Sequence, residues 1–281
     1  MSVRDLDALR RLALDVRIEI VKMMGPNKPH HFGGSLSATD LVTALYMSKM
    51  RYDPERPDWP ERDRFIMSKG HCVPAQYAAL ALLGVFPKEE LATLKLMGTR
   101  LQGHPAAHLL PGIEGCTGSL GQGLSFANGM ALAARMQGLA FDVYCLLGDG
   151  ETQEGQVWEA VRTSSVQCLD RVTAIVDANG LKAMDRSYCG KEMAALAPKF
   201  EAFGWRVREI DGHDMGAIVE ALDWAGESIE APSAIIAETV KGKGISFIED
   251  RAEYHNAALT PEQIAQALEE LEAQRVEMEE A

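Results

Sequence analysis

Two apolar segments joined by a helix-like stretch constrain the fold of this chain most strongly. The run Val143–Leu147 leads into a Gly-Asp-Gly turn that contains Asp149, and the run Val172–Val176 leads into an Asp-Ala-Asn-Gly turn that contains Asn179. A helix is expected between them, over about residues 154–166. A strand, a helix and a second strand of this kind are typical of a parallel sheet. Both polar residues would then follow the carboxyl ends of strands, where open parallel sheets bind ligands.

The side chains at these two strand ends have the chemistry of a metal site. A carboxylate and an amide are hard oxygen ligands suited to Mg²⁺ or Ca²⁺, and Mg²⁺ usually completes its shell with the oxygens of a bound phosphate. The glycines beside Asp149 would let a phosphate approach backbone N–H groups at a helix start. The stretch therefore predicts a metal–diphosphate site. Taken alone, it fits equally well an Asp that caps a helix and an Asn in a turn.

Composition narrows the classes of function. The chain has 281 residues, 47% of them hydrophobic, which suits one large α/β domain or two small ones. A net charge of −13 argues against nucleic acid or an anionic membrane as a partner, so any phosphate site must be built locally. Five scattered Cys without a Cys-x-x-Cys pair favour reduced thiols in the cytoplasm. No apolar run approaches the length of a membrane span.

Before the central stretch, loops rich in His and Gly follow predicted elements. A helix is expected over about residues 5–24, and the next segment, with His31 and a Gly-Gly pair, is expected to be a loop before a helix that Ser37 caps. A short strand, Arg64–Met67, leads into Ser-Lys-Gly-His. Five glycines between residues 112 and 123 predict a tight loop or one that lets a ligand near its backbone.

The second half of the chain continues the alternation of strands and helices. Residues 182–198 show no regular pattern and are expected to be irregular, and Lys241 lies in a Lys-Gly-Lys-Gly turn that suits a phosphate. Residues 261–281 predict an acidic helix that docks on or caps a domain formed by residues 1–260. Two further strands are expected at Trp205–Ile210 and Ser233–Glu238. The whole pattern predicts an α/β fold with a doubly wound, mostly parallel sheet flanked by helices.

Seven segments together resemble the N-terminal, diphosphate-binding half of transketolase, over roughly residues 5–260. The segments are His31-Phe-Gly-Gly-Ser-Leu-Ser, Asp63-Arg-Phe-Ile-Met-Ser-Lys-Gly-His71, Gly103-His-Pro, Gly115-Cys-Thr-Gly-Ser-Leu-Gly-Gln-Gly123, Gly148-Asp-Gly-Glu-Thr-Gln-Glu-Gly155, Asp177-Ala-Asn-Gly, and Lys241-Gly-Lys-Gly with His255. The resemblance implies the thiamine diphosphate-binding fold and thiamine diphosphate as cofactor.

The resemblance also implies roles for individual residues. The metal, Mg²⁺ or alternatively Ca²⁺ or Mn²⁺, would be held by Asp149, Asn179 and the carbonyl of Leu181. The diphosphate and the rest of the cofactor would be contacted by Gly150, His71, His255, Lys241, Gly118, Ser119 and Leu120. Glu154 is placed with them because it resembles a glutamate at the family's dimer contact that couples two sites. The candidate catalytic residues would be His31, His71, His104 and His255, which would orient hydroxyls and shuttle protons because imidazole titrates near neutrality.

Full-length transketolases carry a pyrimidine-binding domain and a C-terminal domain that this sequence does not show. The pyrimidine-binding domain normally supplies a glutamate that activates the cofactor. The resemblance is therefore to the N-terminal subunit of a split, two-chain transketolase. It implies a C-terminal partner subunit, an α₂β₂ heterotetramer, sugar phosphate substrates and activity only in the complex.

Three departures from the family pattern leave the sugar open. His30-His31-Phe stands where Ser-Gly-His-Pro is usual, the stretch after Asn179 is more basic than usual, and Asn256 stands where Gly usually follows the histidine. A branched-sugar phosphate or a sulfosugar is thus an alternative to a pentose phosphate. Further alternatives are a subunit that decarboxylates a 2-oxoacid and a non-enzymatic regulatory module, which the histidines and the intact metal ligands argue against.

Overall fold

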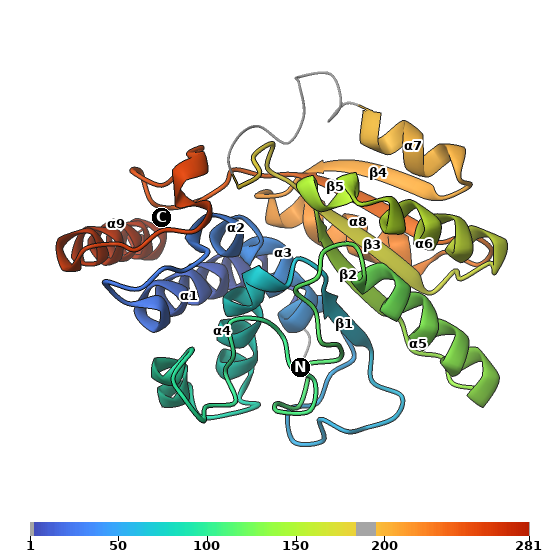
Figure 1. Ribbon diagram of the computed structural model, residues 1–281, viewed down its shortest axis with the longest axis horizontal. Coiled ribbons are helices and arrows are strands. Elements are labelled where there is room, and N and C mark those ends of the chain that lie inside the picture. The colour runs from blue at the N-terminus through green and yellow to red at the C-terminus, as the bar shows by residue number, and fades with distance from the viewer. Residues whose placement is uncertain (1–2, 184–194, 281) are drawn as a thin grey trace.

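A computed structural model of the chain describes residues 3–183 and 195–280 (Figure 1). Its centre is a five-stranded sheet in the order β1-β2-β3-β5-β4, and every neighbouring pair of strands is parallel. The strands are β1 (Arg64–Met67), β2 (Val143–Gly148), β3 (Val172–Ala178), β4 (Arg206–Asp211) and β5 (Ser233–Glu238). All residues of β2 and β3 are buried, as expected for apolar strands covered on both faces. The predicted fold class and all five predicted strands are confirmed.

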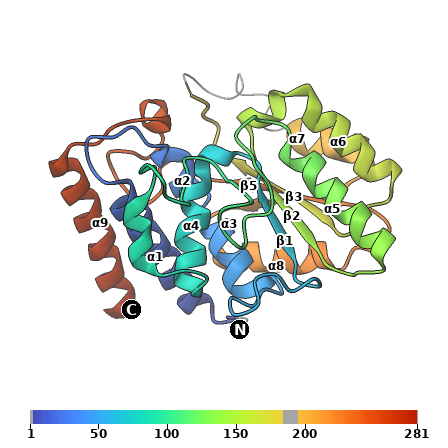
Figure 2. The ribbon, with the colours of Figure 1, turned by 60° about the horizontal axis from the view of Figure 1, so that its bottom comes forward.

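Two helical layers cover the sheet, one on each face (Figures 1 and 2). The side chains of β2 alternate between them, so that Leu146 belongs to one core and Leu147 to the other. One layer contains α1 (Leu6–Met24), α3 (Thr39–Ala44), α4 (Val73–Leu83) and α8 (Met215–Gly226). The other contains α5 (Gly123–Gln137), α6 (Gly155–Val166) and α7 (Leu196–Ala202). Single 3₁₀ turns occur at Gly70–Cys72, Lys88–Thr93, Gly150–Gln153 and Ala252–His255.

The segment predicted as a loop after His31 is helical, so this prediction is wrong. Helix α2 spans Phe32–Ser37, and Ser37 is its last residue rather than the cap of the next helix. The two glycines serve close packing rather than flexibility. A Cβ on Gly33 would lie 2.8 Å from Lys241 Cγ, and one on Gly34 would lie 2.6 Å from Cys72 Sγ. Helix α3 and a π-helical turn, Leu45–Lys49, continue the chain.

The later predictions are met in part. Most of residues 182–198 lie outside the described residues, but α7 begins at Leu196, so the end of that segment is helical. The C-terminal helix α9 (Pro261–Glu280) begins as predicted, because Thr260 Oγ1 accepts the N–H of Gln263 at 3.2 Å. It packs along α1 through Ala267 and Leu271. The domain boundary at residue 260 stays a prediction.

Across residues 3–183 and 195–280, none of the helices is both long and apolar enough to cross a bilayer.

Candidate active site

A cavity of about 480 Å³ opens at the edge of the sheet where the strands end. It is built from separate parts of the chain: the start of α2, the turn after β1, the glycine-rich loop, the ends of β2 and β3, and the turn after β5. All but two of the predicted site residues line it: His31, His71, His104, Gly118, Leu120, Asp149, Gly150, Asn179, Leu181, Lys241 and His255. Tertiary structure thus brings together residues that lie up to 224 positions apart in sequence (255 − 31).

The proposed metal ligands lie at the ends of two adjacent strands. The Asp149 carboxylate accepts the N–H of Gly150 through one oxygen and the N–H of Gly180 through the other, each at 2.7 Å. The second bond ties the end of β2 to the turn after β3. In that turn, Asn179 Oδ1 accepts the N–H of Leu181 at 3.1 Å. Backbone N–H groups therefore hold both carboxylate oxygens of Asp149 and contact the amide oxygen of Asn179.

Three lysines supply positive charge to the cavity of this otherwise acidic chain: Lys69, Lys182 and Lys241. Lys241 is 1% exposed, and its ammonium donates to the carbonyls of Leu181 at 3.0 Å and of Lys182 at 3.2 Å. Burial, with a contribution from nearby Lys69, lowers the pKa of Lys241 to about 8. The cavity thus has the local basic groups that the predicted phosphate site requires.

Three imidazoles form a cluster at the cavity wall. The ring centroids of His31, His71 and His255 are separated by 4.8 Å, 5.1 Å and 5.3 Å. Burial, followed by the neighbouring lysines and histidines, lowers the pKa of His31 and of His255 to about 4. Burial also lowers the pKa of His104, the fourth predicted catalytic histidine, whose residue is exposed and lies outside this cluster. At neutral pH the rings of His31 and His255 are therefore neutral and can donate and accept hydrogen bonds. The proton-transfer role of the four histidines stays a prediction.

A buried glutamate, which the sequence analysis did not select, shapes the glycine-rich loop. The Glu151 carboxylate accepts the N–H of Gly121 at 2.9 Å, the N–H of Gly148 at 3.1 Å and the hydroxyl of Ser68 at 2.5 Å. It thereby joins the loop to the ends of β1 and β2. Within the loop, Gly118 has φ +137°, and a Cβ there would lie 2.8 Å from His104 Cδ2. Only glycine fits this position without displacing the imidazole.

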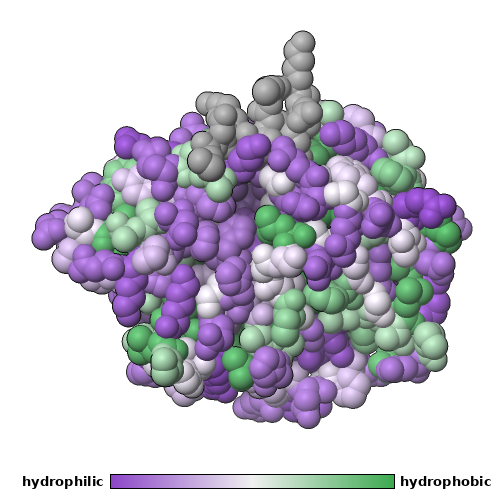
Figure 3. All heavy atoms as spheres, viewed as in Figure 1, coloured by the Kyte–Doolittle hydropathy of each residue, from purple (hydrophilic) through white to green (hydrophobic). Residues whose placement is uncertain are grey.

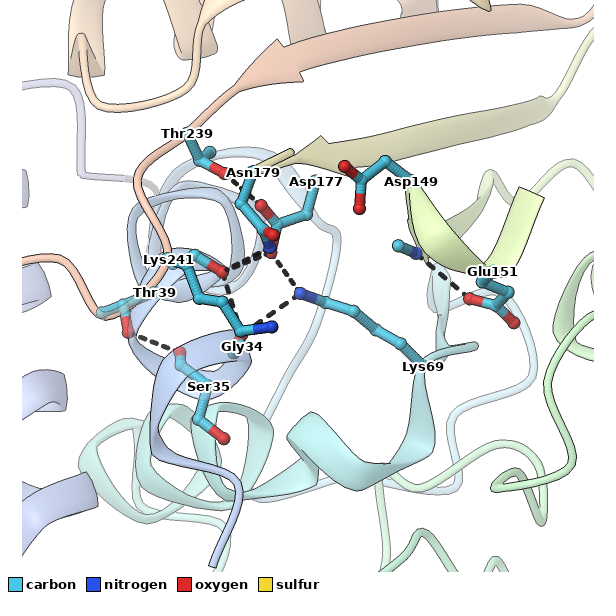
Figure 4. Close-up of polar contacts among 12 residues, drawn as sticks. Gly34, Ser35, Thr39, Lys69, Asp149, Glu151, Asp177, Asn179, Thr239 and Lys241 are labelled. Carbon is cyan, nitrogen blue, oxygen red and sulfur yellow. Dashed lines mark hydrogen bonds and ion pairs between the residues drawn. The ribbon is translucent and has the colours of Figure 1, made fainter. Parts of the chain in front are cut away.

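Sequence analysis also missed a buried ion pair that adjoins the cavity. Lys69 and Asp177 form an ion pair, and Thr239 donates its hydroxyl to the same carboxylate (Figure 4). The sequence signal that could have indicated this pair is Asp177 near the end of a mostly apolar strand. A buried carboxylate needs a cationic or hydrogen-bonding partner, so an Asp in this position predicts one. The partner is 108 residues away and has no local signature.

Ser119 and Glu154 are the two predicted residues that do not line the cavity. Both residues are exposed. Glu154 lies against the glycine-rich loop, because a Cβ added to Gly121 would lie 2.8 Å from the Cβ of Glu154. Glu154 immediately precedes α6 but makes no capping bond with its side chain. Their predicted contacts with the cofactor and with a second site stay predictions.

The donor atoms around Asp149 fit a divalent metal whose shell a diphosphate completes. The candidate ligands are a carboxylate, an amide oxygen and a backbone carbonyl, all hard donors. Among the residues that the structure describes, no group of three or more His, Cys, Asp or Glu side chains could hold a metal by itself. The lysines that line the cavity suit an anionic ligand, which could supply further oxygen atoms to a metal at this edge.

Comparisons with known proteins identify the family of the chain. The family described as "Transketolase, thiamine diphosphate binding domain" matches residues 4–277. A 6-deoxy-6-sulfo-D-fructose transketolase subunit of Clostridium sp. (strain MSTE9) is 43% identical over 97% of this chain and 98% of that protein. An apulose-4-phosphate transketolase subunit of Phocaeicola vulgatus is 38% identical over 93% and 92% of the two chains.

Solved structures show the same fold. Transketolase from Campylobacter jejuni has a TM-score of 0.83 and 30% identity, covering 97% of this chain and 43% of that one. Transketolase from Leishmania mexicana has a TM-score of 0.83 and 26% identity, covering 100% and 47%. The chain thus spans less than half the length of these two transketolases, but nearly the whole of the Clostridium and Phocaeicola proteins. Because the family matches almost the entire sequence and relatives of similar length share about 40% of its residues, the chain belongs to the transketolase family, as a member with the thiamine diphosphate-binding domain.

Proposed function

We propose that this chain is the N-terminal subunit of a two-chain transketolase, which transfers a two-carbon ketol unit from a ketose to an aldose. The observation that carries the proposal is a single cavity that joins a diphosphate-and-metal edge, with Asp149, Asn179 and Lys241, to a wall of neutral imidazoles. The first part suits a phosphorylated cofactor and the second suits a polyhydroxylated substrate. The relatives of similar length are named as transketolase subunits, which supports the two-chain arrangement.

The residues of this chain would divide the work between them. Asp149, Asn179 and the Leu181 carbonyl would hold the metal, which we take to be Mg²⁺, with Ca²⁺ or Mn²⁺ as alternatives. Lys241, His71 and His255 would contact the diphosphate, and the bound thiamine diphosphate would supply the chemistry that cleaves a bond next to a ketose carbonyl. His31 and His104 would orient substrate hydroxyls as neutral donors and acceptors.

The partner would be a C-terminal, pyrimidine-binding subunit in an α₂β₂ complex. Ser119 and Glu154 are exposed beside the cavity, where a partner could complete the site. The adjoining helices also carry exposed apolar side chains, among them Phe126 and Met136 on α5 and Val166 on α6. Hydrophobic groups are more frequent at the lower right of Figure 3, the side on which Figure 1 shows α5. These features support docking on this side of the molecule.

The substrate would be an anionic sugar of an unusual kind. Two of the relatives are named for 6-deoxy-6-sulfo-D-fructose and apulose-4-phosphate. In this chain, two of the departures from the family pattern lie side by side, because His30 pairs through its backbone with Ala257, the neighbour of Asn256. The ring of His30 is buried and makes no hydrogen bond with the described residues. Because it is buried and does not line the cavity, it would influence the sugar through packing rather than through direct contact.

The test is reconstitution with the candidate C-terminal subunit. We expect transfer activity from the two chains together, and none from either chain alone, with a sulfosugar, a branched-sugar phosphate and a pentose phosphate compared as donors. Replacement of Asp149 by Ala should abolish it. Robust activity from the purified single chain would contradict the two-chain proposal. Turnover of a 2-oxoacid with an electron acceptor, and of no ketose, would favour the decarboxylating alternative.

A further inference from the structure

We propose that Ser37, held by the buried Asp177–Lys69 pair, fixes the orientation of the Asn179 side-chain amide and thereby sets the metal affinity of the site. This inference rests on the metal-binding role proposed above for Asn179. Ser37, Asp177 and Lys69 are positioning residues in it, since none of them is proposed to touch the metal. Figure 4 shows Lys69 reaching toward Asp177 and Asn179 at the end of β3.

The first step is the charge of the buried pair. Asp177 is 0% exposed and Lys69 is 3% exposed. The Lys69 ammonium forms an ion pair with the Asp177 carboxylate. The hydroxyl of Thr239 donates to the same carboxylate. A carboxylate that is buried against an ammonium keeps its charge, because the opposite charge favours the ionised form. The carboxylate is therefore an anion, and an anionic carboxylate can only accept hydrogen bonds.

The second step is the direction of the Ser37 hydroxyl. Its oxygen lies 2.5 Å from Asp177 Oδ2 and 3.2 Å from the carbonyl oxygen of Gly34. A serine hydroxyl has one proton, and a bond to a charged acceptor is shorter and stronger than one to a neutral carbonyl. The carbonyl of Gly34 also accepts a hydrogen bond from the ammonium of Lys69 at 3.1 Å, so it has a donor even without the serine hydroxyl. Ser37 therefore donates its proton to Asp177.

The third step follows from the lone pairs left on Ser37. The Ser37 oxygen lies 3.3 Å from Asn179 Nδ2, and with its proton committed it can only accept there. The amide NH₂ of Asn179 must point toward Ser37. Its oxygen then accepts the N–H of Leu181 at 3.1 Å. A flipped amide would place lone pairs against lone pairs at Ser37 and donors against donors at Leu181.

The consequence concerns the metal. Of the two ends of the amide, only the oxygen can bind a cation. The Asp177 carboxylate thus acts through one serine hydroxyl to keep that oxygen on the side of Leu181, the other proposed ligand in the same turn. Partners that orient metal ligands commonly change metal affinity by 10- to 100-fold when they are removed.

The main experiment compares two serines of α2 in the full-length chain. Mg²⁺ is titrated calorimetrically in the presence of excess thiamine diphosphate for the wild type, Ser37→Ala and Ser35→Ala. Ser35 is the matched control, because it is equally buried but donates to the carbonyl of His31 at 2.8 Å and does not contact Asn179. We expect Ser37→Ala to weaken Mg²⁺ binding about tenfold and Ser35→Ala to leave it nearly unchanged.

Repeating Ser37→Ala in a second variant, Asn179→Asp, separates the loss of amide orientation from a general disturbance of the site. In Asn179→Asp both side-chain oxygens are acceptors, so no orientation remains to be fixed. There, Ser37→Ala should cost no further Mg²⁺ affinity, and the two changes should be strongly non-additive. An equal loss in both backgrounds would overturn the proposal, as would wild-type affinity in Ser37→Ala.

A measurement without any ligand keeps the inference testable if the single chain binds no metal. The side-chain NH₂ signal of Asn179 is assigned in a ¹⁵N-asparagine-labelled chain by its loss in Asn179→Asp. We expect its hydrogen exchange to be faster in Ser37→Ala than in the wild type and Ser35→Ala. Unchanged exchange would overturn the positioning role. Failure of every variant to bind Mg²⁺ even with the C-terminal subunit present, together with the expected exchange, would instead count against the proposed function.

Discussion

The ammonium of Lys241 lies 3.0 Å from the carbonyl oxygen of Leu181, the same atom that the metal is proposed to bind. It also lies 3.0 Å from Nδ1 of His255. An ammonium and a divalent metal repel each other at short range, so the two cations would compete for this oxygen. The Lys241 ammonium therefore lies beside the proposed metal position, close enough to contact a diphosphate bound to that metal.

Lys241→Met should weaken the binding of thiamine diphosphate at saturating Mg²⁺ by about tenfold or more. A hydrogen bond to a charged group contributes about 1.5–3 kcal/mol, and about 1.4 kcal/mol is a factor of ten. Calorimetric titration measures the change, and Lys243→Met, whose side chain is 39% exposed, is the control. Equal affinities in the two variants would show that Lys241 does not contact the diphosphate.

Asp149→Asn should remove most of the metal-dependent binding of the cofactor. The substitution deletes a charge from a proposed metal ligand and turns an NH₂ group against the N–H of Gly150 or of Gly180. In a titration with thiamine diphosphate and Mg²⁺, we expect the affinity for the cofactor to fall at least about tenfold. Glu159→Gln, which changes an exposed carboxylate on α6, is the control and should keep the wild-type affinity. Retained affinity in Asp149→Asn would place the metal elsewhere.

His71 should make folding stability depend on pH below neutrality. Burial, followed by nearby Lys69 and the other imidazoles, lowers the pKa of His71 from its ordinary value of 6.5 to about 2. Between these values the unfolded chain binds a proton that the folded chain does not, so the free energy of unfolding falls as the pH is lowered. One such group contributes at most about 1.4 kcal/mol per pH unit.

The test of this pH dependence compares urea unfolding of the wild type and His71→Asn at pH 7, 6 and 5. We expect a shallower loss of stability in the variant. His108→Asn, at an exposed position, is the matched control and should keep the slope of the wild type. Parallel curves for all three proteins would mean that His71 is protonated in the folded chain.

The cysteines should differ sharply in their reaction with iodoacetamide. Burial raises the pKa of the Cys72 thiol to about 11, and Cys145 is buried in the core with its pKa raised well above the ordinary value. The thiolate is the reactive form, so both should stay unlabelled in the native chain at pH 8. Cys116 and Cys168 are exposed and should react. Peptide mass spectrometry reads out the pattern, and rapid labelling of Cys72 would indicate that α4 opens at its start.

The sequence by itself determined the elements and the edge at which the site forms. Strand and helix periods are local, so β2, β3 and the helix between them could be predicted from residues 143–176 alone. Parallel strands also place their carboxyl ends together, which is why Asp149 and Asn179 could be assigned to one site. The resemblance then added the histidines, which local pattern could not have grouped.

Only the tertiary structure decided how the site is held. The helical conformation of Phe32–Ser37 depends on packing of its glycines against Lys241 and Cys72, and this overrides the local preference for a loop. Ser37 meets Asp177 across 140 residues of sequence, and Lys69 meets it across 108. Such contacts have no local signature, because a buried charge can be satisfied by any partner that the fold brings to it. The lowered pKa values of the histidines likewise come from burial, which exists only once the chain has folded.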